Sequence, residues 1–290
     1  MSRSSQRKLL TLPSLLVLPL LASPFVTAQA PKKDAKAIVS SAAATELEAD
    51  HTDHSAYMYR DHDVAPDHDT VIQVIETPVG ALHRKIEDHG KPLTPEERAT
   101  EDDRIQKLLH DQAQQRKLRK DNDHDNDQAE ALLKLLPDAF TWSVTEENGD
   151  LITLDFKRNP SFEPQSMEER VFASMDGQIV VAKGDNRIRT IRGRMGADVK
   201  ILYGLLGGLR KGGTFDVERR EVAPHHWQVV ELHVHITGKV FFATIGSQED
   251  EWKTDFKVST AQNLQQAWEI ALAQTTANKT SASLGRPQGK

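Results

Sequence analysis

Residues 227–237 read WQVVELHVHIT, and in this stretch apolar and polar side chains alternate. Successive side chains of a strand point to opposite faces, so the alternation predicts a strand with one dry and one wet face. The apolar face carries Val230, Leu232, Val234 and Ile236. The polar face carries Glu231, His233 and His235. A half-buried antiparallel sheet is the usual setting for such a strand.

Similar runs, separated by turn-forming residues, surround this stretch. We expect strands at 57–64, 70–77, 81–88, 140–146, 151–157, 171–175, 178–182, 187–194, 214–221, 240–246 and 251–258. Hairpin turns are expected at 147–150, 176–177, 183–186, 223–225 and 237–239. In the run 151–157, Ile152, Leu154 and Phe156 share a face. Sequential hairpins of this kind build one large antiparallel sheet, and a sheet this wide tends to curl.

Helical periodicity interrupts the strands twice. Thr94-Pro95-Glu96-Glu97 predicts a helix start, with Thr94 as N-cap, proline at the first position and Glu97 completing a capping box. A charged helical insertion should therefore occupy residues 94–136, interrupted at 121–127 (DNDHDND) and ended by Pro137. Residues 261–272 predict a last helix. The fold class is α+β: a large curved antiparallel sheet, or half-barrel, with a charged helical insertion and a C-terminal helix.

The N-terminus has the pattern of a secretory signal peptide over residues 1–28. Arg3, Arg7 and Lys8 precede a short apolar stretch, and Val26-Thr27-Ala28 offers a cleavage site after Ala28. We expect a periplasmic or secreted protein that does not span the membrane once it is processed. Residues 29–56 are expected to form a disordered leader, 57–272 a single domain, and 273–290 a disordered tail.

Composition narrows the function further. The 290 residues carry a formal net charge of −6, which argues against a general nucleic-acid binder. The absence of cysteine excludes disulfides, thiolate metal sites and cysteine nucleophiles. The chain contains no G-x-S-x-G and no H-E-x-x-H motif, so we expect neither catalysis nor a cofactor.

Histidine and aspartate recur together at 51–54, 61–63, 67–69 and 123–125. These residue types suit Zn²⁺, Ni²⁺ or Cu²⁺, yet most of them fall in the expected leader and first strands, where nothing fixes their geometry. His233 and His235 are better placed, because two histidines at i and i+2 of a strand point the same way. An ordinary polar, solvent-facing sheet surface is the favoured interpretation, because the opposite face is the apolar one. We therefore assign no metal site and keep a His-rich metal-binding protein as an alternative.

One segment carries a family resemblance. Residues 175–200 (MDGQIVVAKGDNRIRTIRGRMGADVK), with Gly90–Arg98 and Leu135–Phe140, resemble a family of uncharacterised secreted bacterial proteins. That family is similar to the outer-membrane lipoprotein-sorting proteins of LolA/LolB type. The resemblance implies a half-barrel closed by helices around an apolar hollow that takes acyl chains, and it carries over no catalytic residue.

The expected function is then a soluble, non-catalytic periplasmic carrier of a lipid or acyl chain. The apolar lining would be formed by Ile152, Leu154, Phe156, Val230, Leu232, Val234 and Ile236. A structural or interaction protein with a closed core, which meets an envelope protein partner, is the other alternative.

Overall fold

The computed structural model describes residues 34–201, 207–240 and 243–284. The expected signal peptide, the start of the expected leader and the end of the expected tail lie outside these residues, as do 202–206 and 241–242. All that follows concerns the compact unit that begins at Asp34.

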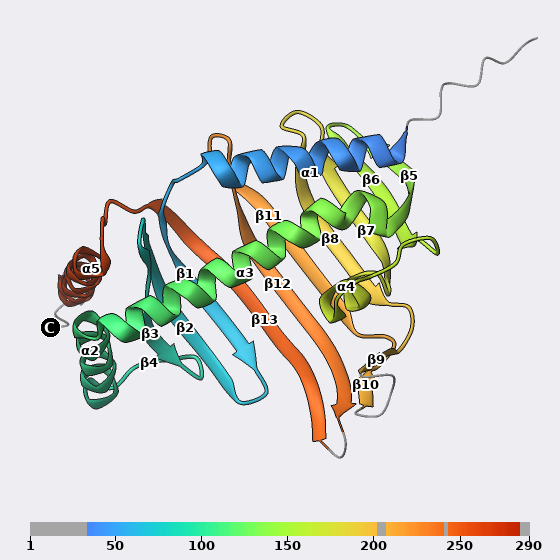
Figure 1. The fold of residues 1–290 in the computed structure, drawn as a ribbon. Coiled ribbons are helices and arrows are strands. Elements are labelled where there is room, and N and C mark those ends of the chain that lie inside the picture. Colours follow the sequence, from blue (N-terminus) through green and yellow to red (C-terminus); the bar gives the residue numbers. More distant parts are fainter. Residues whose placement is uncertain (1–33, 202–206, 241–242, 285–290) are drawn as a thin grey trace, which may run out of the picture. The chain divides into compact units, whose positions relative to one another are not determined.

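The fold is α+β, and its centre is one large antiparallel sheet that does not close on itself (Figure 1). Thirteen strands of the described residues belong to it, and its main path runs β4-β3-β2-β1-β13-β12-β11-β8-β7-β6-β5, with β9 and β10 attached beside β12. The bounds of the first strands are β1 Tyr57–Ala65, β2 His68–Thr77, β3 Gly80–Asp88, β4 Lys91–Pro92, β5 Phe140–Asn148, β6 Leu151–Arg158 and β7 Met175–Ala182. The remaining strands are β8 Arg187–Met195, β9 Val199–Ile201, β10 Gly207–Leu209, β11 Thr214–Ala223, β12 His226–Val240 and β13 Ala243–Val258.

Among the described residues, five helices accompany the sheet. They are α1 Ala35–Thr52, α2 Pro95–His110, α3 Gln112–Ala139, α4 Met167–Phe172 and α5 Leu264–Leu284. Helices α1 and α3 both cross the sheet, whereas α2 and α5 lie at the β1–β4 end (Figure 1). None of the helices in the described ranges is long and apolar enough to cross a membrane.

The expected disordered leader is wrong where α1 lies. Ala35, Val39, Ala42 and Ala43 of this helix are buried in or beside the core, and Asp34 caps its start by accepting a hydrogen bond from the Ala37 amide at 3.2 Å. Small apolar residues spaced by three and four positions allow the helix to approach the sheet closely. The expected disordered tail is wrong in the same way up to Leu284, because α5 continues well past residue 272.

The capping box at Thr94 is confirmed. The Thr94 hydroxyl accepts from the Glu97 amide at 3.2 Å, and the Glu97 carboxylate accepts from the Thr94 amide at 2.8 Å. The expected interruption at 121–127 is wrong, since α3 is continuous there, and the break falls at Asp111, which caps α3. All residues of 116–129 are exposed, so the helix buries none of their charged side chains. No desolvation cost therefore opposes helix formation there.

Three expected strands or turns differ from the structure. Residues 167–172 form α4 rather than the start of a strand at 171–175. Gly177 and Gly238 lie inside β7 and β12 instead of in turns. The reason is close strand approach: a Cβ on Gly177 would lie 1.9 Å from the Arg192 carbonyl oxygen, and one on Gly238 would lie 2.5 Å from that of Gly208.

Two buried clusters hold the sheet to its helices. The larger joins α1 and α3 to strands β5–β8 and contains, among others, Val39, Leu136, Phe140, Leu154, Ile179 and Met195. The smaller joins α2 and α5 to β2 and β3 through Ile75, Leu82, Ile105, Ala261, Ala267, Trp268 and Ala271. The sheet therefore has separate helical covers at its two ends.

Candidate ligand-binding pocket

The seven residues expected to line an apolar hollow share one face of the sheet, as the alternation predicts. Ile152, Leu154 and Phe156 are only 5%, 0% and 2% exposed and belong to the larger cluster. Helices α1 and α3 cover them with Val39 and Leu136. At this end of the sheet the space is filled by the protein's own side chains.

Strand β12 continues that face with less cover. Val230 is buried, Leu232 and Val234 are half-buried, and Ile236 packs against the larger cluster. These four residues do not line the large pocket described next, and neither do the three of β6. The predicted lining is therefore not the wall of that pocket.

A pocket of about 810 Å³ lies at the other end of the sheet, where it is lined by residues of strands β13 and β1–β4 and of helices α2 and α5. We call it the α5 pocket. Its lining comprises Met58, Tyr59, Arg60, Gln73, Arg84, Lys85, Ile86, Glu87, Pro92, Leu93, Arg98, Asp255, Lys257, Gln274 and Thr275. Its volume falls in the range of about 300–1,000 Å³ that is typical of small-molecule sites.

Direct contacts hold α5 against the strands at this pocket. The Gln73 side-chain amide donates to the Gln274 carbonyl oxygen at 2.5 Å, and the Gln274 amide lies 3.0 Å from the Met58 sulfur. Arg84 is 3% exposed; its guanidinium donates to Asp102 at 2.7 Å and to the Thr275 hydroxyl at 2.7 Å. It also lies 5.1 Å from the Trp268 ring centroid. These contacts hold the wall of the pocket that α5 forms against strands β1, β2 and β3.

The charged lining has an excess of cations. Of the lining residues that the structure describes, five are arginine or lysine and two are acidic. Arg60 pairs with Glu87, Lys85 pairs with Asp88 at 2.9 Å, and Arg98 donates to the Leu93 carbonyl oxygen at 2.9 Å. Lys257 is exposed and has no ion-pair partner among the residues that the structure describes. The pocket therefore offers an apolar wall beside a free positive charge.

The sequence does not predict this pocket, because segments that are distant along the chain build it. Met58 and Lys257 face each other across the β1–β13 pair, whereas Gln274 and Thr275 belong to a region expected to be disordered. The available signal was the alternation of Met58 and Arg60 in β1, which places an apolar and a basic side chain on one face.

The histidines of β12 do point the same way. His233 Nδ1 and His235 Nε2 both approach one oxygen of Asp250, at 2.6 and 3.0 Å. Burial opposes ionisation of Asp250, but these two hydrogen bonds outweigh it and hold the pKa of its carboxyl below the usual value. His233 and His62 both contact the Trp252 ring, with centroids 5.2 and 5.5 Å away. The arrangement satisfies the imidazoles within the protein, as a polar sheet face does.

Asp61 of β1 is a half-buried acid with few partners, and its side chain is 15% exposed. Burial raises its pKa to about 6, and the carboxylates of Glu251 and Asp63 add to this against the opposing charge of Lys253. Lys253 lies 3.7 Å from Asp61 but only 3.1 Å from Glu251. One Asp61 carboxylate oxygen is buried and has no hydrogen-bond partner in the part of the chain that the structure describes.

We predict that Asp61→Asn stabilises the protein at neutral pH. Between pH 4 and 6 the folded protein holds a proton on Asp61 that the unfolded chain has lost, so stability falls as pH rises through this window. Urea unfolding at pH 7.5 should therefore show Asp61→Asn more stable than the native protein by about 2 kcal/mol, and at pH 4.5 by much less. Asp103→Asn, at an exposed position of α2, is the control and should change neither value. Equal effects of Asp61→Asn at both pH values would contradict the prediction.

No protein-family model, no curated protein and no solved structure matches this chain. The resemblance to the lipoprotein-sorting proteins accordingly stays a prediction.

Proposed function

We propose that the protein is a non-catalytic carrier of the bacterial envelope that binds an acyl chain with an anionic head group in the α5 pocket. The observation that carries the proposal is a pocket of about 810 Å³ in which apolar side chains lie beside an excess of cations. The N-terminal signal pattern supports the placement in the envelope.

The two parts of the lining suit the two parts of such a ligand. Met58, Ile86 and Leu93 would contact the chain, and each buried methylene contributes about 0.8 kcal/mol. A carboxylate or phosphate at the end of the chain would meet Lys257, whose ammonium forms no ion pair with other described residues. Arg60 belongs to the same lining as Lys257, its side chain is 42% exposed, and it can donate a second hydrogen bond to the head group.

This proposal keeps the ligand class that the resemblance implies and moves the site. The acyl chain would lie at the β1–β4 end, because the β5–β8 end is occupied by α1 and α3. No residue of the α5 pocket is assigned a catalytic role, since the proposed mechanism needs only burial of apolar surface and neutralisation of one charge.

Fluorescence titration with a dansyl-labelled undecanoic acid tests the proposal. We expect saturable binding to the purified protein, weakened about tenfold in Lys257→Glu because the head group meets a negative charge instead of a positive one. Ile86→Glu should weaken it at least as much by placing a carboxylate in the apolar wall. Lys157→Glu, at an exposed strand position of β6 outside the pocket, should bind as the native protein does.

The competitor 1-dodecanol separates the two contributions. It has a chain without a charge, so its dissociation constant, calculated from the displacement curve with the probe affinity of each protein, should be nearly the same for the native protein and Lys257→Glu. No saturable binding of the fatty acid, or equal affinities for the native protein and both pocket variants, would refute the proposed function.

A further inference from the structure

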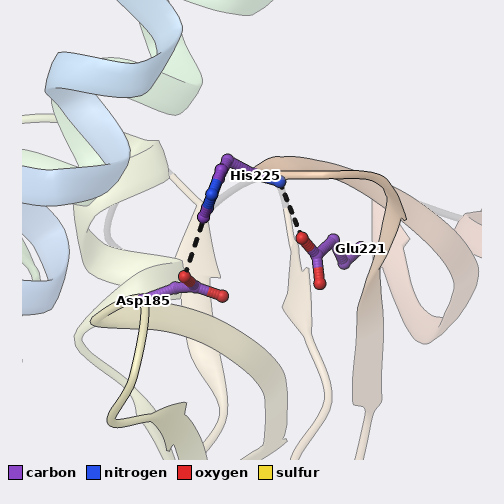
Figure 2. A group of neighbouring side chains, drawn as sticks. All are labelled: Asp185, Glu221 and His225. Atoms are coloured by element: carbon purple, nitrogen blue, oxygen red, sulfur yellow. Dashed lines mark hydrogen bonds and ion pairs between the residues drawn. The ribbon is translucent and has the colours of Figure 1, made fainter.

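Two hairpin turns that are distant in the sequence bring three metal-ligating side chains together. Asp185 lies in the turn between β7 and β8, and Glu221 and His225 lie at the turn between β11 and β12 (Figure 2). One ligand atom from each residue, a ring nitrogen or a carboxylate oxygen, lies within 4.8 Å of the other two. In Figure 2 the imidazole of His225 points toward Asp185, and the Glu221 carboxylate lies beside the His225 backbone.

The three side chains lie close together, but they form few hydrogen bonds with one another. His225 Nδ1 is 3.5 Å from the nearest Asp185 oxygen, which is long for a hydrogen bond. Glu221 accepts a hydrogen bond from the His225 backbone N–H at 2.6 Å, and its other oxygen is left for a ligand. The His225 side chain is 85% exposed and that of Asp185 34%, so an ion can reach the group from solvent.

The charges of the group are also unbalanced. Two carboxylates lie within 4.8 Å of each other, and neither forms an ion pair with lysine or arginine among the residues that the structure describes. Lys183, in the same turn as Asp185, lies 4.0 Å from Glu147 instead. A divalent cation would neutralise the two carboxylates, which now repel each other.

Contacts from other elements fix both turns. In the first turn, the Gly184 amide donates to the Asp150 carboxylate at 3.2 Å, and the Asn186 side chain donates to the Thr45 hydroxyl of α1 at 2.6 Å. In the second, His226 Nδ1 lies 2.8 Å from the Asp53 carboxylate at the end of α1. Turns held in this way present their ligands in nearly constant positions, which lowers the entropic cost of binding an ion.

We propose that Asp185, Glu221 and His225 form a surface site for one divalent transition-metal ion such as Zn²⁺. One imidazole nitrogen and two carboxylate oxygens suit Zn²⁺ and its first-row neighbours, whereas Mg²⁺ and Ca²⁺ prefer oxygen ligands alone. Small rotations of the exposed side chains would bring the three atoms to the usual zinc distances of about 2.0–2.2 Å, and water would complete the coordination. The site is separate from the α5 pocket, and none of its residues belongs to that lining.

Isothermal titration of the purified protein with zinc chloride tests the site. We expect one site per chain, at least tenfold weaker in His225→Ala and in Asp185→Asn, and weakened in Glu221→Gln, which keeps an oxygen to accept the His225 N–H bond. The matched control is His89→Ala, which removes a histidine of comparable exposure (73%) that also lies beside an aspartate, Asp88. It should bind zinc as the native protein does. Melting temperatures in EDTA show whether each variant remains folded.

Thermal unfolding gives a second readout. Zinc should raise the melting temperature of the native protein and of His89→Ala, but not that of His225→Ala, and magnesium should raise none of them. Absence of zinc binding would overturn the proposal. Unchanged affinity in His225→Ala or in Asp185→Asn would also overturn it, because the ion would then be held at another histidine or by a lone imidazole.

Discussion

Replacing Glu46 by alanine should lower the free energy of unfolding by about 3–5 kcal/mol. Glu46 belongs to α1, and its side chain is 5% exposed. One carboxylate oxygen accepts from Arg187 at 2.8 Å and pairs with Arg219, and the other accepts from the Ile188 amide at 2.7 Å. The alanine variant would leave two guanidinium groups and one backbone N–H without their acceptor in a largely buried place.

Two variants distinguish the loss of the buried carboxylate from any effect of the substitution on the helix itself. Glu48→Ala, at an exposed position of the same helix, should change stability by less than about 0.5 kcal/mol in urea unfolding. Glu46→Gln keeps an oxygen for the Ile188 amide and should fall between the two. A loss for Glu46→Ala no greater than that for Glu48→Ala would mean that this carboxylate does not hold α1 to the sheet.

The same carboxylate gives the stability an acid dependence. Burial raises the pKa of Glu46, but the hydrogen bond from Arg187 and the charge of Arg219 outweigh it, so the pKa lies below the usual 4.5. Its contribution is therefore present above that value and is lost as pH falls through the lowered pKa. Glu46→Gln should show a flatter fall in stability than the native protein below pH 4.5.

Helix α1 shows why this anchor could not be predicted from composition. Residues 29–56 contain few large apolar side chains, which is typical of disorder. The informative signal is spacing: Ala35, Val39, Ala42 and Glu46 repeat at helical intervals, and all are buried. This row of buried residues is short and includes an acid, so the helix alone does not show that the row is buried. It can be recognised as a buried face only once Arg187 and Arg219 of the sheet, which pair with Glu46, are known.

Hairpins and caps were predictable because their signals are local. Strands β1, β2 and β3 and the capping box at Thr94 follow from residues adjacent in sequence. The α5 pocket does not follow from residues adjacent in sequence, since its residues meet only after α5 packs on β1–β3. The alternation in β6 and β12 correctly predicts a shared apolar face, but a face alone does not say whether helices fill it, as α1 and α3 do above Leu154.

Replacing Gly177 by alanine should destabilise the protein by about 3 kcal/mol, because the new methyl group has no space. Gly177 of β7 pairs with Phe156 on one side and Gly193 on the other. Its Cβ would lie 1.9 Å from the Arg192 carbonyl oxygen and 2.7 Å from the Phe156 ring. Backbone carbonyls within a sheet cannot move aside without breaking ladder hydrogen bonds, so the strands must separate.

Gly193 provides the matched comparison, because its obstacle is a side chain. A Cβ there would lie 2.0 Å from the Phe215 ring, which covers the glycine from the neighbouring strand β11. Gly193→Ala should therefore be partly rescued by Phe215→Leu in urea unfolding, whereas Gly177→Ala should not be rescued by Phe156→Leu. Gly184→Ala, whose Cβ would meet only the movable Asp150 carboxylate at 3.2 Å, should cost little. Rescue of both glycine variants, or of neither, would contradict the prediction. It would mean that an obstructing side chain and an obstructing backbone carbonyl have the same effect at these two positions.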